Sequence, residues 1–348
     1  MKKILSLLLT LSLVLALCAC GGDASNEPAA DDTQSQETAA AEPAGDSIEL
    51  IMSIGTSQNL KDGADKFKEL VEEASNGTIT ITIYADSVLG DDRVATETTQ
   101  FGDIDIAVCS TSQSAGVYPN LLAFDAPFLF LSTDEVDTIM DGEGAKAILD
   151  GMEDVGLKGL AFWENGFRNL TNDKREVRVP SDLEGLKIRT MENEIVLATW
   201  SAFGANPTPM AFAEVYPGLQ QGTIDGQENP LSVIYANGLQ EVQKYISITQ
   251  HQYTPFVVFM NLDKFNSLTA EQQQIILDAA TETTPYQREI SRQYDQDILE
   301  SIKEEGNVVS ELTMEEKSLW QQAVQEANIF DMIKETMSEP ELFDALLG

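Results

Sequence analysis

The hydrophobic and polar positions of this chain repeat with two periods, and together they predict an α/β fold. Ile48–Ile54 is almost continuously apolar and predicts a buried strand. From Asn59 to Ala74 the apolar residues recur at helical spacing, and Asn76-Gly77 ends this predicted helix. Thr78–Tyr84 is rich in β-branched residues and predicts a second strand. A strand, a helix and a strand with a connection of this length form a βαβ unit, which favours a parallel sheet covered by helices.

More strands and helices are predicted before residue 165. The segment Asp91-Asp92-Arg93 begins a helix, and Ile104–Cys109 predicts a third strand. Thr133–Leu149 predicts one helix with two acidic residues in its first turn, and Leu157–Trp163 predicts another strand. The aromatic run Ala126–Phe130 favours core packing over stacking on a ligand.

Short elements are predicted in the next hundred residues. A Pro-rich turn at Pro207-Thr208-Pro209 precedes a short helix at Ala211–Gln221. Thr223–Glu228 predicts a strand and a turn. Two separate β runs follow at Tyr245–Thr249 and Tyr253–Met260, and the second is expected to return to the first part of the fold.

The C-terminal part predicts long helices. Thr269–Glu305 has a helical pattern that is expected to break or kink around Pro285, because proline removes a backbone donor. Val308–Leu312 follows, and Met314–Met337 predicts a final helix.

The first 46 residues carry a secretory pattern and a linker. Residues 1–20 combine two lysines with the apolar run Ile4–Leu17, which is shorter than the ~20 residues of a membrane span. Leu17-Cys18-Ala19-Cys20 matches a bacterial lipobox, so Cys20 is the predicted lipidation site, with a plain cleaved signal as the alternative. Residues 21–46 contain no aromatic and no basic residue and predict a disordered acidic tether, and the fold begins near Ser47.

Composition and charge narrow the possible functions. At 348 residues with 43% apolar residues, the chain is long enough for two domains with real cores. The formal net charge of −37 repels phosphate backbones, so we expect no nucleic-acid partner and interpret the acidic excess as a solubilising surface. Cys20 and Cys109 remain after signal removal and offer neither a disulfide framework nor zinc-ligand spacing, so we expect no metal and no cofactor. A catalytic triad with an imidazole would need His251, the one histidine, as its base.

The candidate chemistry lies between positions 185 and 230. Arg189 ends a short β-prone run, Phe212 begins a helix, and Asn229 lies in a polar loop. A guanidinium beside a carboxamide and an aromatic face suits the bidentate capture of a small carboxylate. The alternative for Arg189 is a surface ion pair with Glu184 or Glu192.

The same stretch resembles the substrate-binding proteins of TRAP transporters, the tripartite ATP-independent periplasmic carriers. The resemblance is carried by GLKIRT, GANPTPMAFAEVY and LQQGTIDGQENP, and upstream by LGDDR and NGFRNLTN, in that family's order. It covers roughly Ile48 to the end of the chain. It implies an α/β fold of two lobes, like other periplasmic binding proteins, with strands that cross between the lobes and a long helix at 269–305 lying along both. Lobe I is expected to contain residues 47–165 and about 255–294, and lobe II residues 166–254 and about 295–348.

The resemblance also implies which residues bind the ligand. Arg189 matches the family's principal carboxylate-binding arginine, and Asn229 and Arg168 match residues that contact the same ligand. From the sequence alone, Asn229 is equally a turn residue before proline, and Arg168 is equally a partner of a strand-end carbonyl. Phe212 matches an aromatic that packs on the ligand or, alternatively, into the core, and Asp91 matches a polar contact or simply a favourable helix N-terminal charge. The full predicted set is Arg189, Arg168, Asn229, Phe212, Asp91, Trp163 and Glu164.

The function implied by the resemblance is transport. We expect an extracytoplasmic solute-binding protein that is not an enzyme, captures a small organic-acid anion by closure of its lobes, and delivers it to an ion-driven membrane permease. We further expect a monomer that is anchored through a lipid on Cys20 to the cell membrane, in the periplasm or on the outer face of the cytoplasmic membrane. The ligand is either a C4-dicarboxylate or a sugar acid such as a uronate, and the wording of NGFRNLTN and KIRTMENE slightly favours the sugar acid.

Two other functions stay open on the sequence. One is a surface lipoprotein that acts as a sensor or adhesin and has no transport partner. The other is a secreted hydrolase that uses Asp225 and Glu228 as paired carboxylates.

Overall fold

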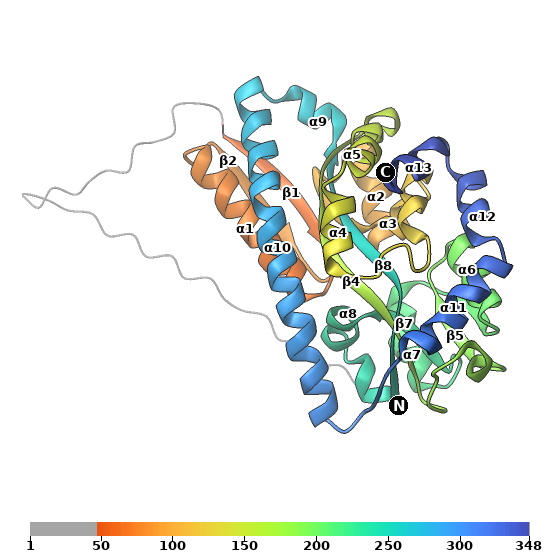
Figure 1. The fold of residues 1–348 in the computed structure, drawn as a ribbon. Helices are drawn as coiled ribbons and strands as arrows, with labels where there is room; N and C mark the ends of the chain where they lie inside the picture. Colours follow the sequence, from red (N-terminus) through yellow and green to blue (C-terminus); the bar gives the residue numbers. More distant parts are fainter. Residues whose placement is uncertain (1–46, 348) are drawn as a thin grey trace, which may run out of the picture. The chain divides into compact units, whose positions relative to one another are not determined.

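The computed structural model describes residues 47–347, which all belong to one compact unit, Pro43–Gly348 (Figure 1). The predicted signal, the tether and the lipidation site at Cys20 lie outside the described residues. None of the helices between residues 47 and 347 combines the length and the apolar character that a membrane span requires.

The described residues form one mixed sheet with the strand order β2-β1-β3-β8-β4-β7-β5-β6, and β9 pairs with β8. β1 (Ile48–Ile54), β2 (Ile79–Tyr84) and β3 (Ile106–Ser110) are parallel, as the βαβ pattern predicts. The sheet is not parallel throughout, because β8 runs antiparallel to both β3 and β4. β4 and β8 are also longer than the strands that the sequence predicts.

β4 (Leu157–Asn172) and β8 (Tyr245–Asn261) join two lobes. The end of β8 pairs with β3, and the end of β4 pairs with β7 (Gly226–Pro230). We call the part around β1, β2 and β3 the first lobe, and the part around β7, β5 and β6 the second lobe. Sixteen or seventeen residues at about 3.3 Å each are long enough to serve both. The residue boundaries expected for the lobes stay a prediction.

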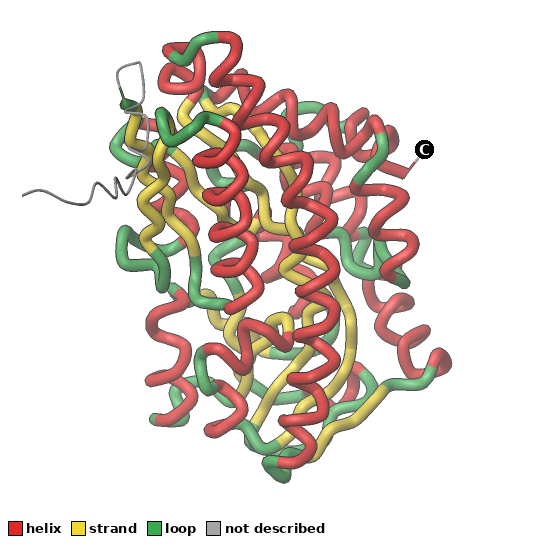
Figure 2. The backbone as a smooth tube through the Cα atoms, turned by 90° about the vertical axis from the view of Figure 1, so that its left-hand side faces the viewer, coloured by secondary structure: helices red, strands yellow, loops and turns green. Residues whose placement is uncertain are grey.

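The long helix lies along the sheet beside α1 (Gln58–Ala74), as Figures 1 and 2 show. α10 (Ala270–Glu304) is continuous through Pro285, so the predicted break is wrong. At 1.5 Å per residue its 35 residues span roughly 50 Å, which is enough to reach both lobes. It begins with a capping box in which Thr269 and Gln272 satisfy each other's backbone donors.

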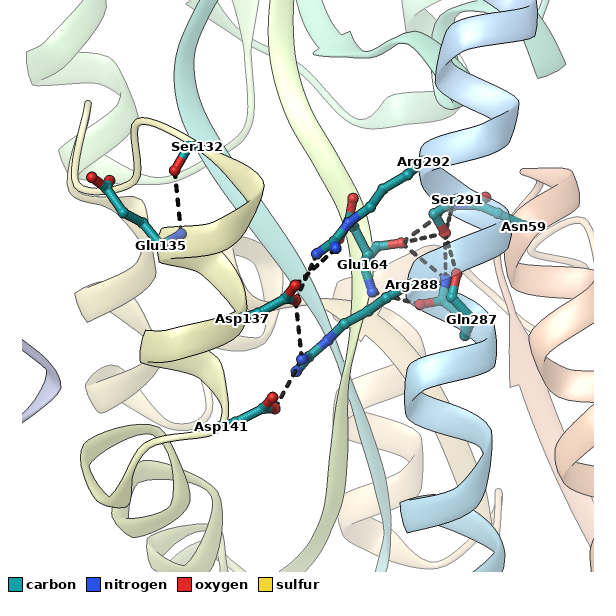
Figure 3. A network of polar contacts seen from close by, with 10 residues as sticks. All are labelled: Asn59, Ser132, Glu135, Asp137, Asp141, Glu164, Gln287, Arg288, Ser291 and Arg292. Carbon is teal, nitrogen blue, oxygen red and sulfur yellow. Dashed lines mark hydrogen bonds and ion pairs between the residues drawn. The ribbon is translucent and has the colours of Figure 1, made fainter.

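Polar contacts fix α10 to the first lobe (Figure 3). Arg292 donates to both carboxylate oxygens of Asp137 at 2.7 and 2.9 Å and to Glu164 at 3.0 Å. Arg288 donates to Asp141 at 2.8 Å. The amide of Gln287 accepts from the backbone N–H of Glu164 and donates to its carbonyl at 2.9 Å, where β4 has a register irregularity. These contacts hold β4 against α10 at the point where the strand leaves the first lobe.

Several predicted boundaries differ from the observed ones. The predicted helix at 133–149 is two helices, α4 (Thr133–Met140) and α5 (Glu143–Asp150). The predicted turn at 207–209 is an edge strand, β6 (Asn206–Pro209), beside β5 (Lys187–Thr190), and an edge tolerates proline because one side needs no donors. The predicted helix at 314–337 is interrupted at Asn328, which has a φ of 53°. The remaining elements are α2 (Asp92–Phe101), α3 (Thr111–Ser114), α6 (Glu194–Ala202), α7 (Val215–Gln220), α8 (Leu231–Ala236), α9 (Leu262–Ser267), β9 (Val308–Glu311), α11 (Met314–Glu326), α12 (Ile329–Thr336) and α13 (Glu341–Leu347).

The carboxylate of Asp295 in α10 lies against Gly166 of β4. Oδ1 of Asp295 is buried and has no hydrogen-bond partner among the described residues. A Cβ atom on Gly166 of β4 would lie 3.1 Å from the other oxygen of Asp295, so glycine permits this approach. Burial, with the nearby charge of Glu164, raises the pKa of Asp295 to about 8, although a backbone bond from Ser232 opposes the shift.

We predict that Asp295→Asn removes a pH-dependent loss of stability. The folded protein holds this proton up to about pH 8, whereas the unfolded chain releases it near pH 4, so wild-type stability falls as pH rises between these values. The gain of the variant over wild type in free energy of unfolding should therefore grow by about 1.4 kcal/mol per pH unit in that window. Urea unfolding at pH 5, 6, 7 and 8 measures it. The exposed neighbour variant Asp297→Asn is the control, and an equal pH trend in both variants would contradict the assignment.

Candidate functional site

A pocket lies where strands from both lobes end. Its first wall comes from the loop after β1, the end of β3, the start of α2 and Asn165 of β4, and its second wall comes from Arg168 of β4 and from β5, β7 and α8. The volume of its cavity is about 80 Å³. It is lined by Gly55, Thr56, Ser57, Leu60, Ser87, Asp91, Asp92, Ser110, Gln113, Asn165, Arg168, Arg189, Met191, Phe212, Asn229, Val233 and Phe256.

Arg189 is a buried cation with no carboxylate partner among the described residues. It belongs to β5, where its neighbour Ile188 is fully buried in the core. The side chain is 1% exposed, and its Nε and Nη2 both donate to the carbonyl of Met210, at 3.0 and 2.8 Å. The predicted alternative, an ion pair with Glu184 or Glu192, does not occur in this part of the chain.

The electrostatics of Arg189 leave it charged. Burial lowers its pKa to about 10, although the nearby Glu228 opposes the shift. The ring of Phe212 lies 5.7 Å from the guanidinium carbon, in the range of a cation–π contact. A desolvated positive charge without a counter-ion is costly, so this arrangement favours an anion in the pocket.

Arg168, in contrast, is already neutralised. Its Nε and Nη2 both bind the carboxylate of Glu228, with 3.0 Å from Nη2 to Oε1. Nη2 also donates to the side-chain oxygen of Asn229 at 2.8 Å. Burial alone would raise the pKa of Glu228, but the Arg168 charge and a hydrogen bond from His251 lower it to about 2. The two arginines of the pocket therefore differ, since only Arg189 lacks a partner of opposite charge.

His251 contacts the carboxylate of Glu228 in this ion pair. Its Nε2 lies 3.2 Å from Glu228, and its Nδ1 lies 2.8 Å from the hydroxyl of Thr249. The ring packs edge-on against Trp200 with centroids 5.1 Å apart. Burial lowers the pKa of His251, which keeps it neutral at physiological pH. The sequence did not indicate that Glu228 and His251 fix the orientation of Arg168.

The hydrolase alternative loses its chemical basis here. Glu228 is fully buried in its ion pair, and a carboxyl with a pKa near 2 cannot act as a general acid. Asp225 accepts from the backbone N–H of Lys187 at 2.9 Å. Neither carboxylate lines the pocket.

Three other predicted residues line the pocket with Arg189 and Arg168. Asn229 is 5% exposed and donates to the side chain of Gln227 at 2.6 Å while it accepts from Arg168. Phe212 is half-buried at the start of a short 3-10 turn. Asp91 caps α2 by accepting from the backbone N–H of Val94 at 3.0 Å, so it serves the helix and lines the pocket at once.

Trp163 and Glu164 are not brought into the pocket. Trp163 is fully buried in the core of the first lobe. Glu164 turns towards α10, where it accepts from Arg292 (Figure 3). Their neighbour Asn165 lines the pocket instead, because successive residues of a strand point to opposite faces.

Apart from Asp91, the sequence analysis did not predict the residues of the first wall. Ser57 and Ser110 follow β1 and end β3, and Asn165 lies within β4. The two serines could have been predicted, because they lie at the carboxyl ends of predicted strands, where open α/β sheets bind their ligands.

We predict that Glu228→Gln destabilises the protein by about 3 to 5 kcal/mol at pH 7, because it leaves the Arg168 charge buried without its partner. Wild-type Glu228 contributes stability above pH 4.5, and this contribution is lost as pH falls towards 2. The difference between the two proteins should therefore shrink on acidification. Urea unfolding at pH 7, 5 and 3 measures this trend. Glu97→Gln, which removes an exposed partner of Arg93, is the control and should change stability little; equal effects of the two substitutions would count against this account.

The chain is similar in sequence and in fold to several known solute-binding proteins. Residues 52–332 match the model of "Bacterial extracellular solute-binding protein, family 7". The chain is 39% identical over 250 residues to the 2,3-diketo-L-gulonate-binding periplasmic protein of Escherichia coli K12, covering 72% of this chain and 76% of that one. The fold is similar to the sugar acid binding protein of Advenella mimigardefordensis in complex with galactonate, with a TM-score of 0.82 and 33% identity over 86% of this chain and 97% of that one. It is also similar to a TRAP periplasmic solute-binding protein of Sulfurospirillum deleyianum with bound succinate, with a TM-score of 0.79 and 31% identity over 86% and 98%.

Proposed function

The chain belongs to the bacterial extracellular solute-binding proteins of family 7, the binding proteins of TRAP transporters, and we propose that Arg189 is the residue by which it captures a small organic-acid anion. The family is one of substrate-binding proteins rather than enzymes. Structural relatives crystallised with galactonate and with succinate support an organic acid as the ligand class. The proposal for the individual residues rests on the geometry of the pocket.

The observation that carries the proposal is the missing counter-ion of Arg189. Both bonded nitrogens of its guanidinium share one carbonyl, and no carboxylate of the described chain lies within 4 Å of it. A carboxylate from solution supplies the absent charge and accepts charge-assisted hydrogen bonds from Nη1, which has no partner among the described residues, and from the second N–H of Nη2. Arg168 adds donors without adding net charge, because Glu228 holds it.

Closure of the two lobes strengthens this attraction. The pocket takes its walls from both lobes, so closure surrounds the ligand and excludes water. In the lower dielectric the attraction between guanidinium and carboxylate rises, and solvent no longer competes for the anion. Binding is favourable only if the remaining lone pairs of the carboxylate are satisfied, and Arg168 and Asn229 stand beside Arg189 for this purpose.

Delivery to a membrane permease completes the proposed function. Membership of a TRAP family implies an ion-driven permease as partner, and the family is periplasmic. The lipid anchor at Cys20, the monomeric state and the position at the outer face of the cytoplasmic membrane belong to the proposal as well. Genes for two multispanning permease subunits beside the gene of this protein would support transport over the sensor or adhesin alternative.

We predict that Arg189→Ala weakens binding of the organic acid by about 3 to 5 kcal/mol, because the variant removes the positive charge that we propose pairs with the ligand's carboxylate. Isothermal titration calorimetry with galactonate and with succinate measures the loss. Arg189→Lys should recover only part of the affinity, since an ammonium cannot form the planar two-point contact.

The matched control is Arg175→Ala, which removes an exposed arginine that donates to the carbonyls of Asp182 and Glu184 outside the pocket. It should leave the affinity unchanged. Wild-type affinity in Arg189→Ala would overturn the assignment of this residue.

A further inference from the structure

We propose that the first wall of the pocket reads the hydroxyl groups of the ligand's tail, so that this protein selects a polyhydroxylated monocarboxylate, an aldonate or uronate, over a dicarboxylate. The inference rests on the proposed capture of an organic acid by Arg189. It concerns residues that the capture itself does not use: Ser57, Ser110, Asn165, Asp91 and Asp92.

Two serines of this wall have hydroxyls without a partner. Ser57 precedes α1 and Ser110 precedes α3, at positions where a serine usually caps the helix by accepting from a backbone N–H. Neither side chain makes that bond, and both Oγ atoms are buried without any partner among the described residues. The residues are 1% and 5% exposed, so water does not reach them freely. A serine hydroxyl changes direction by rotation about one bond, which allows both to turn to a ligand in the pocket.

Asn165 adds an acceptor of the same kind. It is 4% exposed, lines the pocket, and its Oδ1 is buried and unpaired within residues 47–347. A buried polar atom without a partner costs free energy, and three such atoms around one cavity are unusual. Hydroxyl groups satisfy all three at once, since a sugar hydroxyl donates to Asn165 and both donates to and accepts from a serine.

The charges of the pocket disfavour a second carboxylate. The Arg168 charge is already balanced by Glu228, so of the two arginines that line the pocket within residues 47–347 Arg189 alone is unpaired, and a single carboxylate neutralises it. Asp91 and Asp92 line the opposite wall. One oxygen of Asp92 accepts from the backbone N–H of Ser110 at 2.9 Å, which leaves the other for a ligand hydroxyl. A second carboxylate would meet these two acidic side chains, and like charges at close range discriminate strongly.

Calorimetry with galactonate and succinate as the two probes tests the inference on the full chain. Wild type should bind galactonate at least 100-fold more tightly than succinate. Asp92→Asn should reduce this ratio at least tenfold, mainly by strengthening succinate binding. The double variant Ser57→Ala/Ser110→Ala breaks no hydrogen bond of the described protein, so it should fold normally, and it should weaken galactonate at least tenfold while succinate changes little. Ser201→Ala, which removes an exposed hydroxyl outside the pocket, is the control.

The outcomes separate this inference from the proposed function. Succinate binding as tight as galactonate, lost in Arg189→Ala, would overturn the selection of hydroxylated tails and leave anion capture intact. An unchanged ratio in Asp92→Asn together with unchanged galactonate affinity in the double serine variant would also overturn it. Affinities for both acids that do not respond to Arg189→Ala would instead remove the proposed function.

Discussion

Charge balance in a desolvated pocket is the constraint on which the rest of this structure depends. Two arginines lie almost completely buried in one cavity, and their mutual repulsion in a medium of low dielectric is costly. The protein neutralises one of them with Glu228, whose carboxylate binds Nε and Nη2 of Arg168. It leaves the other, Arg189, on a carbonyl dipole alone. Of the two arginines, Arg189 is the one that no carboxylate of the described residues contacts, so the pocket favours an anion from solution at this side chain.

The fold supplies rigidity where this balance requires it. Arg168 lies on β4 close to an irregularity of register, and three groups hold its partner Glu228: Arg168 itself, His251 and the backbone pairing of β7 with β4. Earlier in the same strand, Glu164 is held by α10 through Gln287 and Arg292 (Figure 3). The crossing strand is thus fixed on both sides of the passage between the lobes.

The sequence predicted the anion site better than the wall that faces it, for physical reasons. Arg189 and Asn229 stand in strings specific enough to be recognised, although only Arg189 lies in a predicted β run; Asn229, expected in a polar loop, lies in β7. Glu164 could not be placed, because the side of a strand on which a residue lies depends on bulges that periodicity does not reveal. Pro285 predicted a break that the packing of α10 against α1 and β4 overrides. The unpaired hydroxyls of Ser57 and Ser110 were invisible in the sequence, since a serine before a helix reads as an ordinary cap.

The contacts between the lobes show why ligand and closure belong together. Asn193, at the start of α6, donates to Asp125 at 2.7 Å and to the carbonyl of Ser112 at 3.1 Å, and Asn237 of α8 donates to Thr56 at 2.9 Å. A hydrogen bond between protein groups replaces one to water, so each of these contacts contributes a modest net free energy. Arg189 is different, because closure without an anion buries its charge and no ion pair offsets the cost of desolvation. The empty protein therefore has no strong drive to close, and the carboxylate that pairs with Arg189 changes the sign of that balance.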